Sequence, residues 1–321
     1  MLDHIHIENF RLFKELDIPK VGQVNLITGK NNVGKTTLLE GLRIYQNINT
    51  PLNPNGQILS IILQERGDIN GDYLRSYDTL FNGHKIVVSY GEHTDELRIF
   101  KINDVVISIK DTNNVVFSRF ALEDTKMTFF EISDGKYDAS YFISSRFERA
   151  NSELWKQIEL TEKEEQVVEI LRILEPRITR ISVNDADGSA KVRLKSLLKP
   201  LPLRNFGEGM SRLLTIALGL VSAENDMLLI DEIDLGLHHS VQHTLWEIVF
   251  QNAKDLNVQV FATTHSSDCV EAFSDIANKP ECVGMGNYIR LQRSKKDGNI
   301  MAVDYEMEQL GNALDLNSET R

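Results

Sequence analysis

Residues 24–45, VNLITGKNNVGKTTLLEGLRIY, contain the pattern that decides the fold. The apolar start predicts a short buried strand, the end predicts a helix, and GKNNVGKT between them matches G-x-x-x-x-G-K-[ST]. Such a loop offers backbone N–H groups and a helix N-terminus to phosphate oxygens. An ordinary glycine turn is the alternative, and the strand–loop–helix context argues against it. The sequence therefore predicts a nucleotide-binding P-loop formed by Gly29, Lys30, Asn31, Asn32, Val33, Gly34, Lys35, Thr36 and Thr37.

Two side chains of this loop have expected chemical roles. Lys35 is predicted to reach the β and γ phosphates, as a catalytic as well as a binding residue. The hydroxyl of Thr36 is a predicted metal ligand. The pattern thus predicts ATP and Mg²⁺ as cofactors.

A second motif, MLLIDEID at residues 227–234, places two acids at the end of an apolar strand. Open α/β sheets bind their ligands at this carboxyl edge. Asp231 is the predicted metal ligand, acting through water, and Glu232 the predicted catalytic residue that polarises an attacking water. Acid pairs at strand ends also occur as caps, so the motif gains its meaning from the P-loop. Together the two motifs favour hydrolysis over transfer to an organic acceptor.

His265 follows the next predicted strand, in VFATTHSSD at residues 260–268. If the two strands are neighbours, His265 lies at the same sheet edge as Asp231 and can hydrogen-bond a γ phosphate. It is therefore a third candidate catalytic residue. The alternative is that it only neighbours the helix-capping residues Ser266 and Ser267.

The order of predicted elements indicates an α/β protein. Strands and helices alternate in the last third of the chain, which implies a mainly parallel sheet that includes the strand before the P-loop. Residues 84–131 indicate an antiparallel β meander, residues 155–174 one helix, and residues 177–198 a hairpin. We expect residues 1–150 to form the N-terminal part of a P-loop NTPase core, residues 151–208 an inserted helical and hairpin lobe, and residues 209–321 the C-terminal part.

Composition narrows the class of protein. The chain has 321 residues, 41% of them hydrophobic, which suffices for a large core. A net charge of −12 argues against a surface that coats nucleic acid non-specifically. The N-terminus has no signal-peptide pattern, no apolar run is long enough to span a bilayer, and the two cysteines, Cys269 and Cys282, have no metal-binding spacing. We expect a cytoplasmic protein.

The chain resembles the ABC-type ATPases of the SMC, RecF and OLD-nuclease kind, including standalone bacterial AAA-domain proteins. The stretches that carry the resemblance are IENFRLFKE, GKNNVGKT, NFGEGMSRLL, MLLIDEIDLGLH and FATTHSS. It implies an ABC-type head, a D-loop at residues 234–237 with Asp234 near the nucleotide, and a switch role for His265. It makes Arg11 a candidate nucleotide contact. It also implies a homodimer that sandwiches ATP and controls a separately encoded effector such as a nuclease, in DNA repair or phage defence.

The stretch NFGEGMSRLL departs from the family's signature, which reads close to L-S-G-G-Q. No serine stands at the second position, although Ser211 follows shortly after. We expect Gly207, Gly209 and Ser211 to meet the γ phosphate of a facing subunit through backbone N–H groups and one hydroxyl. Close packing of a helix on the sheet is the rival explanation for the two glycines.

Other features of the family pattern are missing. Neither Gln64 nor Arg146 makes a convincing Q-loop. The predicted helix at residues 155–174 is too short for an SMC coiled coil, and no acidic constellation of a fused Toprim nuclease follows His265.

A basic stretch interrupts this acidic chain. Residues 172–204 contain eight Lys or Arg against three acids, and Lys191, Arg193 and Lys195 fall on one face of a predicted strand. A solvated face is the common explanation. Nucleic acid, an acidic partner and the nucleotide of a facing subunit are the functional ones.

Three alternative functions remain open. The chain could be the nucleotide-binding subunit of an ABC transporter, which the unusual signature and the start IENFRLFKE argue against. It could be a binding module that switches on ATP with negligible turnover. A GTPase is the third alternative. Guanine specificity would require the pattern N-K-x-D, but residues 278–281 read NKPE.

Overall fold

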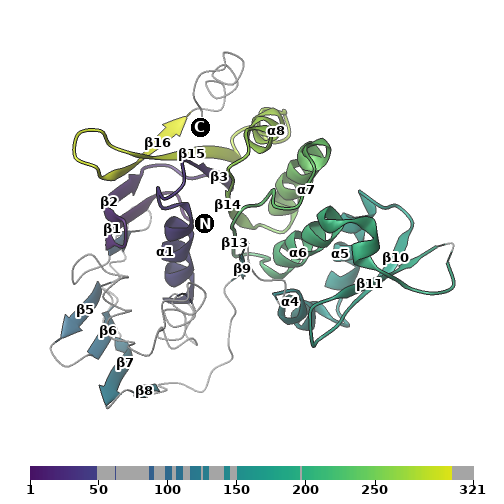
Figure 1. Cartoon of the computed structure of the whole chain (residues 1–321), viewed down its shortest axis with the longest axis horizontal. Coiled ribbons are helices and arrows are strands. Elements are labelled where there is room, and N and C mark those ends of the chain that lie inside the picture. Colours follow the sequence, from purple (N-terminus) through teal and green to yellow (C-terminus); the bar gives the residue numbers. More distant parts are fainter. Residues whose placement is uncertain are drawn as a thin grey trace.

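The computed structural model describes residues 1–48, 62, 87–89, 98–102, 106–110, 116–123, 126–129, 141–144, 150–195 and 197–305. Its core is a six-stranded sheet in the order β16-β15-β3-β14-β13-β9 (Figure 1). All neighbouring strands are parallel except β15 and β16, which form an antiparallel hairpin at one edge. The strands are β3 (Val24–Thr28), β9 (Tyr141–Ile143), β13 (Met227–Ile230), β14 (Gln259–Thr263), β15 (Gly286–Arg293) and β16 (Ile300–Tyr305).

The register of the parallel strands brings the predicted motifs to one edge. Ile27 of β3 pairs with Thr263 of β14, and Ile230 of β13 pairs with Ala262 of β14. The P-loop, the acid pair and His265 each follow the carboxyl end of one of these three neighbouring strands. The prediction of a mainly parallel sheet is therefore confirmed. The strands before Asp231 and His265 are also neighbours, as the predicted role of His265 requires.

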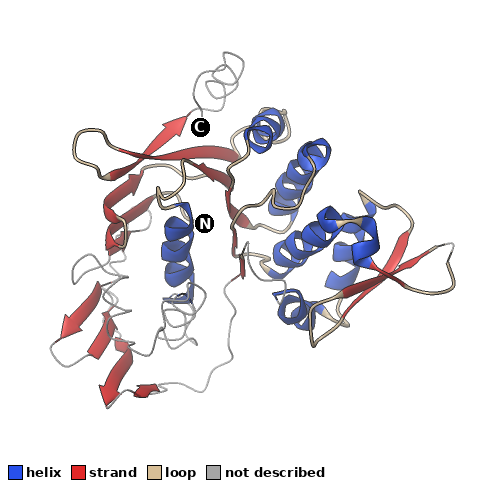
Figure 2. Cartoon of the chain, viewed as in Figure 1, coloured by secondary structure: helices blue, strands red, loops and turns tan. Residues whose placement is uncertain are grey.

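Alternating side chains of the sheet face two different cores, as the period of a strand requires. Leu26 and Leu228 face the helices α6 (Glu208–Ser222), α7 (Gln242–Asp255) and α8 (Ser267–Ala277). Ile27 and Leu229 face α1 (Lys35–Ile48) and the strands β1 (Ile5–Phe10) and β2 (Phe13–Ile18). The sheet is thus covered on both faces, which explains why every residue of β3, β13 and β14 is buried (Figure 2).

Two smaller antiparallel sheets adjoin the N-terminal half. The first has the order β2-β1-β4 and consists of β1 (Ile5–Phe10), β2 (Phe13–Ile18) and β4 (Val87–Ser89). The second has the order β5-β6-β7-β8 and consists of β5 (Arg98–Ile102), β6 (Val106–Lys110), β7 (Val116–Glu123) and β8 (Lys126–Phe129). The predicted meander is confirmed for these four strands. The run KIVVSY was wrongly assigned to it, because β4 pairs with β1, His6 facing Ser89.

Residues 150–195 and 197–206 project from the core, with helices that pack on α6 and a hairpin that packs on those helices (Figure 1). The antiparallel pair β10 (Ile178–Val183) and β11 (Ala190–Leu194) confirms the predicted hairpin, and β12 (Leu201–Pro202) and the short 3-10 helix η1 (Leu203–Phe206) follow it. Figure 2 shows this hairpin at the end of the molecule farthest from α1.

The single helix predicted over residues 155–174 is wrong. The structure has two helices there, α4 (Ala150–Ile158) and α5 (Lys163–Arg172). Between them the hydroxyl of Thr161 donates to the carbonyl of Ile158 at 2.6 Å, and the carboxylate of Glu164 accepts from the amide of Leu160 at 2.6 Å. Such local side-chain bonds offer the backbone an alternative to the helix ladder, so the chain turns at Leu160, whose φ is +63°.

The helix of the signature region begins earlier than the sequence indicated. The stretch SRLLTIALGLVSAE predicts a helix from Ser211, but α6 begins at Glu208, with Gly207 as its N-cap. Gly209 and Ser211 therefore lie in the first turn of α6. In the part of the chain that the structure describes, none of the helices combines the length and apolar character that crossing a bilayer requires.

Candidate functional site: a phosphate loop facing an acid pair

The P-loop curls between β3 and α1 because three of its residues adopt positive φ. These are Gly29 at +141°, Asn32 at +63° and Gly34 at +95°. At Gly34 a side chain is also excluded by space, since a Cβ there would lie 2.7 Å from the ring of Phe13. The curled backbone ends on α1, whose first hydrogen bond runs from the amide of Leu38 to the carbonyl of Gly34 at 2.8 Å. The loop thus has the shape that cradles phosphate.

The remaining loop residues divide into exposed and buried ones. Lys30, Asn31 and Asn32 are exposed, whereas Val33 and Thr37 are buried and anchor the loop on the core. An exposed tip on a buried base leaves the backbone N–H groups of the loop accessible to a ligand.

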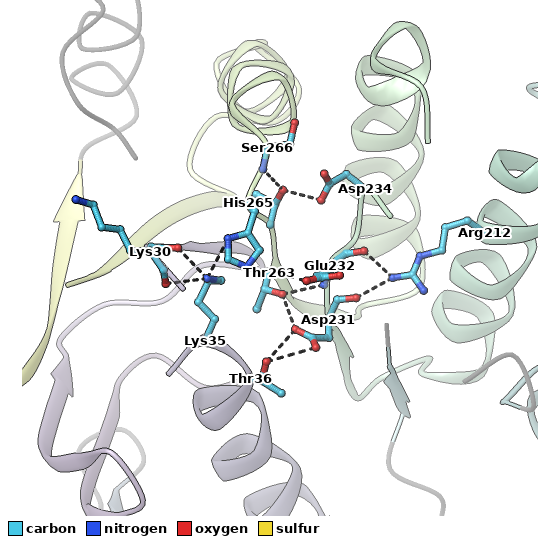
Figure 3. A network of polar contacts seen from close by, with 12 residues as sticks. Lys30, Lys35, Thr36, Arg212, Asp231, Glu232, Asp234, Thr263, His265 and Ser266 are labelled. Carbon is cyan, nitrogen blue, oxygen red and sulfur yellow. Dashed lines mark hydrogen bonds and ion pairs between the residues drawn. The ribbon is translucent and has the colours of Figure 1, made fainter. Parts of the chain in front are cut away.

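Lys35 folds back over the loop that precedes it (Figure 3). Its Nζ donates to the carbonyl oxygens of Gly29 at 2.8 Å and Lys30 at 3.2 Å, and lies 3.4 Å from His265 Nδ1. Burial lowers the pKa of Lys35 from its usual value to about 8, while Asp231 and Glu232 oppose the shift. Among the described residues, no carboxylate forms an ion pair with this amine, which leaves it able to pair with an anionic ligand.

Thr36 and Asp231 meet from opposite elements. The hydroxyl of Thr36, on α1, lies 3.4 Å from each carboxylate oxygen of Asp231, at the end of β13. Asp231 is only 8% exposed and also accepts from the hydroxyl of Thr263 at 2.8 Å. The two predicted metal ligands are therefore adjacent, as a shared cation requires.

Glu232 and His265 stand together at the open side of the site. The carboxylate oxygen Oε1 of Glu232 is 4.0 Å from His265 Nε2, and both side chains are about two-fifths exposed, at 39% and 41%. His265 thus lies between Lys35 on one side and Glu232 on the other (Figure 3). The three predicted catalytic residues form one contiguous group.

Asp234 begins the turn that follows the acid pair. Its carboxylate accepts from the hydroxyl of Thr264 at 2.6 Å, and that hydroxyl accepts from the amide of Ser266 at 3.0 Å. Ser266 in turn caps α8 by accepting from the amide of Cys269. Ser266 is thus the helix-capping residue beside His265. His265 itself contacts Lys35.

Gly207, Gly209 and Ser211 lie at the start of α6, with Gly207 as the N-cap. Gly207 has a φ of +94°, and a Cβ there would meet nothing within 4 Å. Gly209 packs on the predicted D-loop, since its Cβ would lie 3.2 Å from Leu237. Among the described residues, no hydrogen bond joins these three residues to the P-loop. Close packing accounts in part for Gly209 but not for Gly207.

Arg11 is placed differently from the other candidates. It occupies the turn between β1 and β2 with a φ of +51°, and its guanidinium is 3.7 Å from the carboxylate of Glu40 on α1. The structure does not bring it into the contact network of Figure 3. The Q-loop candidates Gln64 and Arg146 lie outside the described residues.

Three site residues escaped the sequence reasoning: Arg212, Thr263 and Thr264. Arg212, on α6, donates through Nη2 to the carbonyls of Asp231 and Glu232, both at 2.8 Å. Thr263 bonds the Asp231 carboxylate and accepts from the Glu232 amide at 2.8 Å. An arginine in the otherwise apolar helix SRLLTIALGLV, and two threonines at the end of a buried strand, were the available signals.

The NKPE stretch is far from this site. Asn278 caps the C-terminal end of α8, and Lys279 contacts Glu247 of α7. Because α8 begins at the carboxyl edge of the sheet and β15 starts level with Val24, residues 278–281 lie at the opposite edge. They cannot read the base of a nucleotide held at the P-loop, which removes this argument for a GTPase.

The family model described as "AAA domain, putative AbiEii toxin, Type IV TA system" matches residues 24–268, which is well over half of the chain. The chain belongs to this family. This AAA domain is an ABC-type P-loop ATPase domain, and the matched segment begins at β3 and ends in the first turn of α8. The family resemblance and the predicted fold class are thereby confirmed.

Other known proteins are similar over most of their length. A protein of Helicobacter pylori (strain ATCC 700392 / 26695), named ATP/GTP phosphatase, is 24% identical over 88% of this chain and 90% of its own. An SMC head bound to the C-winged helix domain of ScpA shares the fold, with a TM-score of 0.54, 13% identity, and coverage of 96% of this chain and 98% of that one. An SMC head domain with an extended coiled coil, derived from Pyrococcus furiosus, gives a TM-score of 0.53 at 11% identity, covering 98% and 99%.

Proposed function

We propose that this AAA domain binds ATP with Mg²⁺ and hydrolyses it at the edge formed by the P-loop, Asp231, Glu232 and His265. One observation carries the proposal. A buried lysine lies 3.4 Å from His265, an exposed carboxylate lies 4.0 Å from the same histidine, and a hydroxyl–carboxylate pair adjoins them at the carboxyl ends of three neighbouring strands. That arrangement supplies positioning and electrostatic stabilisation, which are what phosphoryl transfer demands of a protein.

The residues present fit Mg²⁺. Thr36 and Asp231 offer hard oxygen ligands 3.4 Å apart, and Mg²⁺ is commonly held by one or two carboxylates with water and substrate phosphates. Among the residues that the structure describes, no group of three or more His, Cys, Asp or Glu could hold a metal ion. We therefore propose a site completed by water and phosphate oxygens. When bound, Mg²⁺ would neutralise charge on the β and γ phosphates.

Each remaining residue has a role that its position supports. The P-loop amides and Lys35 hold the phosphates, and His265 contacts the γ phosphate. Glu232 accepts a hydrogen bond from a water that attacks the γ phosphorus. The bond from that phosphorus to the bridging oxygen breaks, ADP leaves with the oxygen, and the proton of the water passes toward Glu232 or the released phosphate.

We further propose that two copies sandwich ATP, with Asp234, Gly207, Gly209 and Ser211 of one copy facing the P-loop of the other. Support comes from the start of α6, where Gly207 is exposed and where, among the described residues, no hydrogen bond joins Gly207, Gly209 or Ser211 to the P-loop of the same chain. In this arrangement residues 151–208 form a lobe inserted between the core segments 1–150 and 209–321.

A wider role follows from the family description, which names AbiEii and a type IV toxin–antitoxin system. We propose a cytoplasmic ATPase that controls a separately encoded effector, such as a nuclease, in phage defence or DNA repair. The free, buried thiols of Cys269 and Cys282 suit a reducing compartment. A subunit of an ABC transporter and an ATP switch with negligible turnover are the alternatives that experiment must separate.

Comparing the wild-type protein with Glu232→Gln tests the proposal. We expect the turnover number for ATP to fall by about 10²-fold to 10⁴-fold, because the variant loses its general base. The apparent ATP affinity should stay within about threefold, since no hydrogen bond joins Glu232 to the P-loop in the described part of the chain. Glu271→Gln, the same change at an exposed position of α8, is the control and should leave turnover unchanged.

Three outcomes would contradict parts of the proposal. Equal turnover in the wild type and Glu232→Gln would remove the enzyme claim and favour the binding module. An unchanged monomer when Glu232→Gln is sized with ATP would count against the sandwich. Faster hydrolysis of GTP than of ATP would show that GTP is the preferred nucleotide. This comparison is worthwhile because the Helicobacter pylori relative is named an ATP/GTP phosphatase.

A further inference from the structure

Arg212 is a cation held by carbonyl oxygens at the end of β13. Its Nη2 donates to the carbonyls of Asp231 and Glu232 at 2.8 Å, and Nη1 lies 3.5 Å from the carbonyl of Ser144, just after β9. Burial lowers the pKa of Arg212, and nearby Asp231, Asp234 and Glu232 oppose that shift. A buried guanidinium is costly to keep, and here its hydrogen bonds go to the backbone of the two acids on which hydrolysis depends.

The backbone at Glu232 needs such support. Its φ is +50°, a left-handed conformation that a residue with a side chain rarely adopts. The backbone of Glu232 is hydrogen-bonded at both ends: its amide donates to Thr263 Oγ1 at 2.8 Å, and its carbonyl accepts from Arg212. This clamp of Arg212 and Thr263 fixes the direction in which the Glu232 carboxylate leaves the chain, toward His265 (Figure 3).

Arg212 also belongs to the first turns of α6. It directly follows Ser211, and Gly209 one turn earlier packs against the D-loop residue Leu237. A ligand that pulls or presses on the start of α6 would therefore move the guanidinium that holds Glu232. The connection is short, because it runs through one helix turn and one side chain.

We propose that Arg212 is a positioning residue that transmits contact at the first turn of α6 to the carboxylate of Glu232. This inference rests on the proposed function, in which Glu232 activates water and the first turn of α6 meets the nucleotide of a second copy. Arg212 acts through Glu232, because the hydrogen bonds that it donates go to the backbone around the acid pair. Its effect is to make the activity of one copy depend on engagement by the other.

The test is a double-mutant cycle on the full chain with Arg212→Lys and Glu232→Gln. We expect Arg212→Lys to lower the turnover number for ATP by about 100-fold, the cost of a misplaced catalytic group, because one ammonium cannot keep the fork geometry. The KM and the ATP dissociation constant should stay within about threefold. In the Glu232→Gln background the same change should have no further effect, since the residue it positions is gone.

Arg172→Lys is the matched control, because Arg172 also donates to a backbone carbonyl, that of Ile178, but lies on α5. It should leave turnover within twofold. Should Arg212→Lys fail to fold, Arg212→Gln, whose amide can donate to one of the two carbonyls without a charge, gives the same measurement.

The outcomes separate the two proposals. If Glu232→Gln is slow but Arg212→Lys turns over at the wild-type rate, the coupling is wrong and the proposed function stands. If Arg212→Lys lowers the residual rate of Glu232→Gln by the same factor as in the wild type, or raises KM in proportion, Arg212 acts on binding or folding and the coupling is again wrong. If Glu232→Gln is as fast as the wild type, the proposed function fails, and the coupling with it.

Discussion

The P-loop and the first turn of α6 are both glycine-bearing starts of helices, but they are built differently. Each P-loop glycine is enclosed, because a Cβ at Gly34 would meet Phe13 and one at Gly29 would lie 2.4 Å from the carbonyl of Leu291. At Gly207 a Cβ would meet nothing. The first helix start is complete within one chain, whereas the second faces outward. This contrast fits the proposed ATP sandwich, in which one chain would hold half of a site and offer the complementary half to a second copy.

The largest expected effect that tests this contrast is on pairing. Gly209→Asp adds a carboxylate to the first turn of α6, where we expect it to repel the γ phosphate of a second copy and abolish ATP-dependent dimers. ATP affinity should change by less than about threefold, because the P-loop of the same chain is untouched. Light scattering in the Glu232→Gln background, with and without ATP, measures the first effect, and a nucleotide titration the second.

Ala186→Asp, the same carboxylate in the exposed turn between β10 and β11, serves as the control for Gly209→Asp and should still dimerise. Loss of stability in Gly209→Asp without any selective loss of pairing would show that the glycine serves only the packing of α6 on Leu237.

A moderate effect is expected from pH, and it concerns the P-loop side alone. The pKa of Lys35 is lowered to about 8, so the amine is charged below pH 7 and becomes neutral as the pH rises through 8. Phosphate binding favours the charged amine. ATP affinity should therefore be constant below about pH 7 and fall above pH 8, by at most about tenfold per pH unit.

Isothermal titration between pH 6.5 and 9.5, in two buffers of different ionisation enthalpy, measures both the affinity and the expected uptake of a proton by the complex. Lys35→Arg keeps its charge throughout this range and should show no such decline. An affinity of the wild type that does not vary with pH would contradict the lowered pKa.

The smallest effect is expected in the lobe, away from both halves of the site. Arg180 of β10 and Arg193 of β11 face each other directly, and both are exposed. Like charges in such a pair are unfavourable, so Arg193→Gln should stabilise the protein by about 0.3 kcal/mol. Urea unfolding measures this, and Arg172→Gln, which loses its ion pair with Glu165, should shift the midpoint the other way. Destabilisation by Arg193→Gln would show that Arg193 has a favourable contact.

Sequence reasoning succeeded where the functional residues form short contiguous motifs. The P-loop, the acid pair and His265 each follow a strand directly, so a local pattern was enough to place them at one sheet edge. Arg212 and Thr263 were missed because their partners, three backbone groups and the Asp231 carboxylate, lie 19 to 32 residues away in sequence. A local residue pattern does not predict which distant backbone carbonyl an arginine will donate a hydrogen bond to.

Errors of element assignment have the same origin. The break between α4 and α5 depends on hydrogen bonds of Thr161 and Glu164, which the apolar face of the predicted helix concealed. The T-x-x-E spacing was the available signal. The pairing of β4 with β1 joins residues about 80 positions apart, and alternation alone cannot choose such a partner.

The register of β3, β14 and β13 has a practical consequence. The main-chain ladder, rather than any side chain of the site, sets how far the phosphate loop stands from the two acids. Variants that remove the chemistry should therefore keep their shape. An inactive form such as Glu232→Gln can then serve as bait, holding whatever molecule the working protein would engage and release with each cycle.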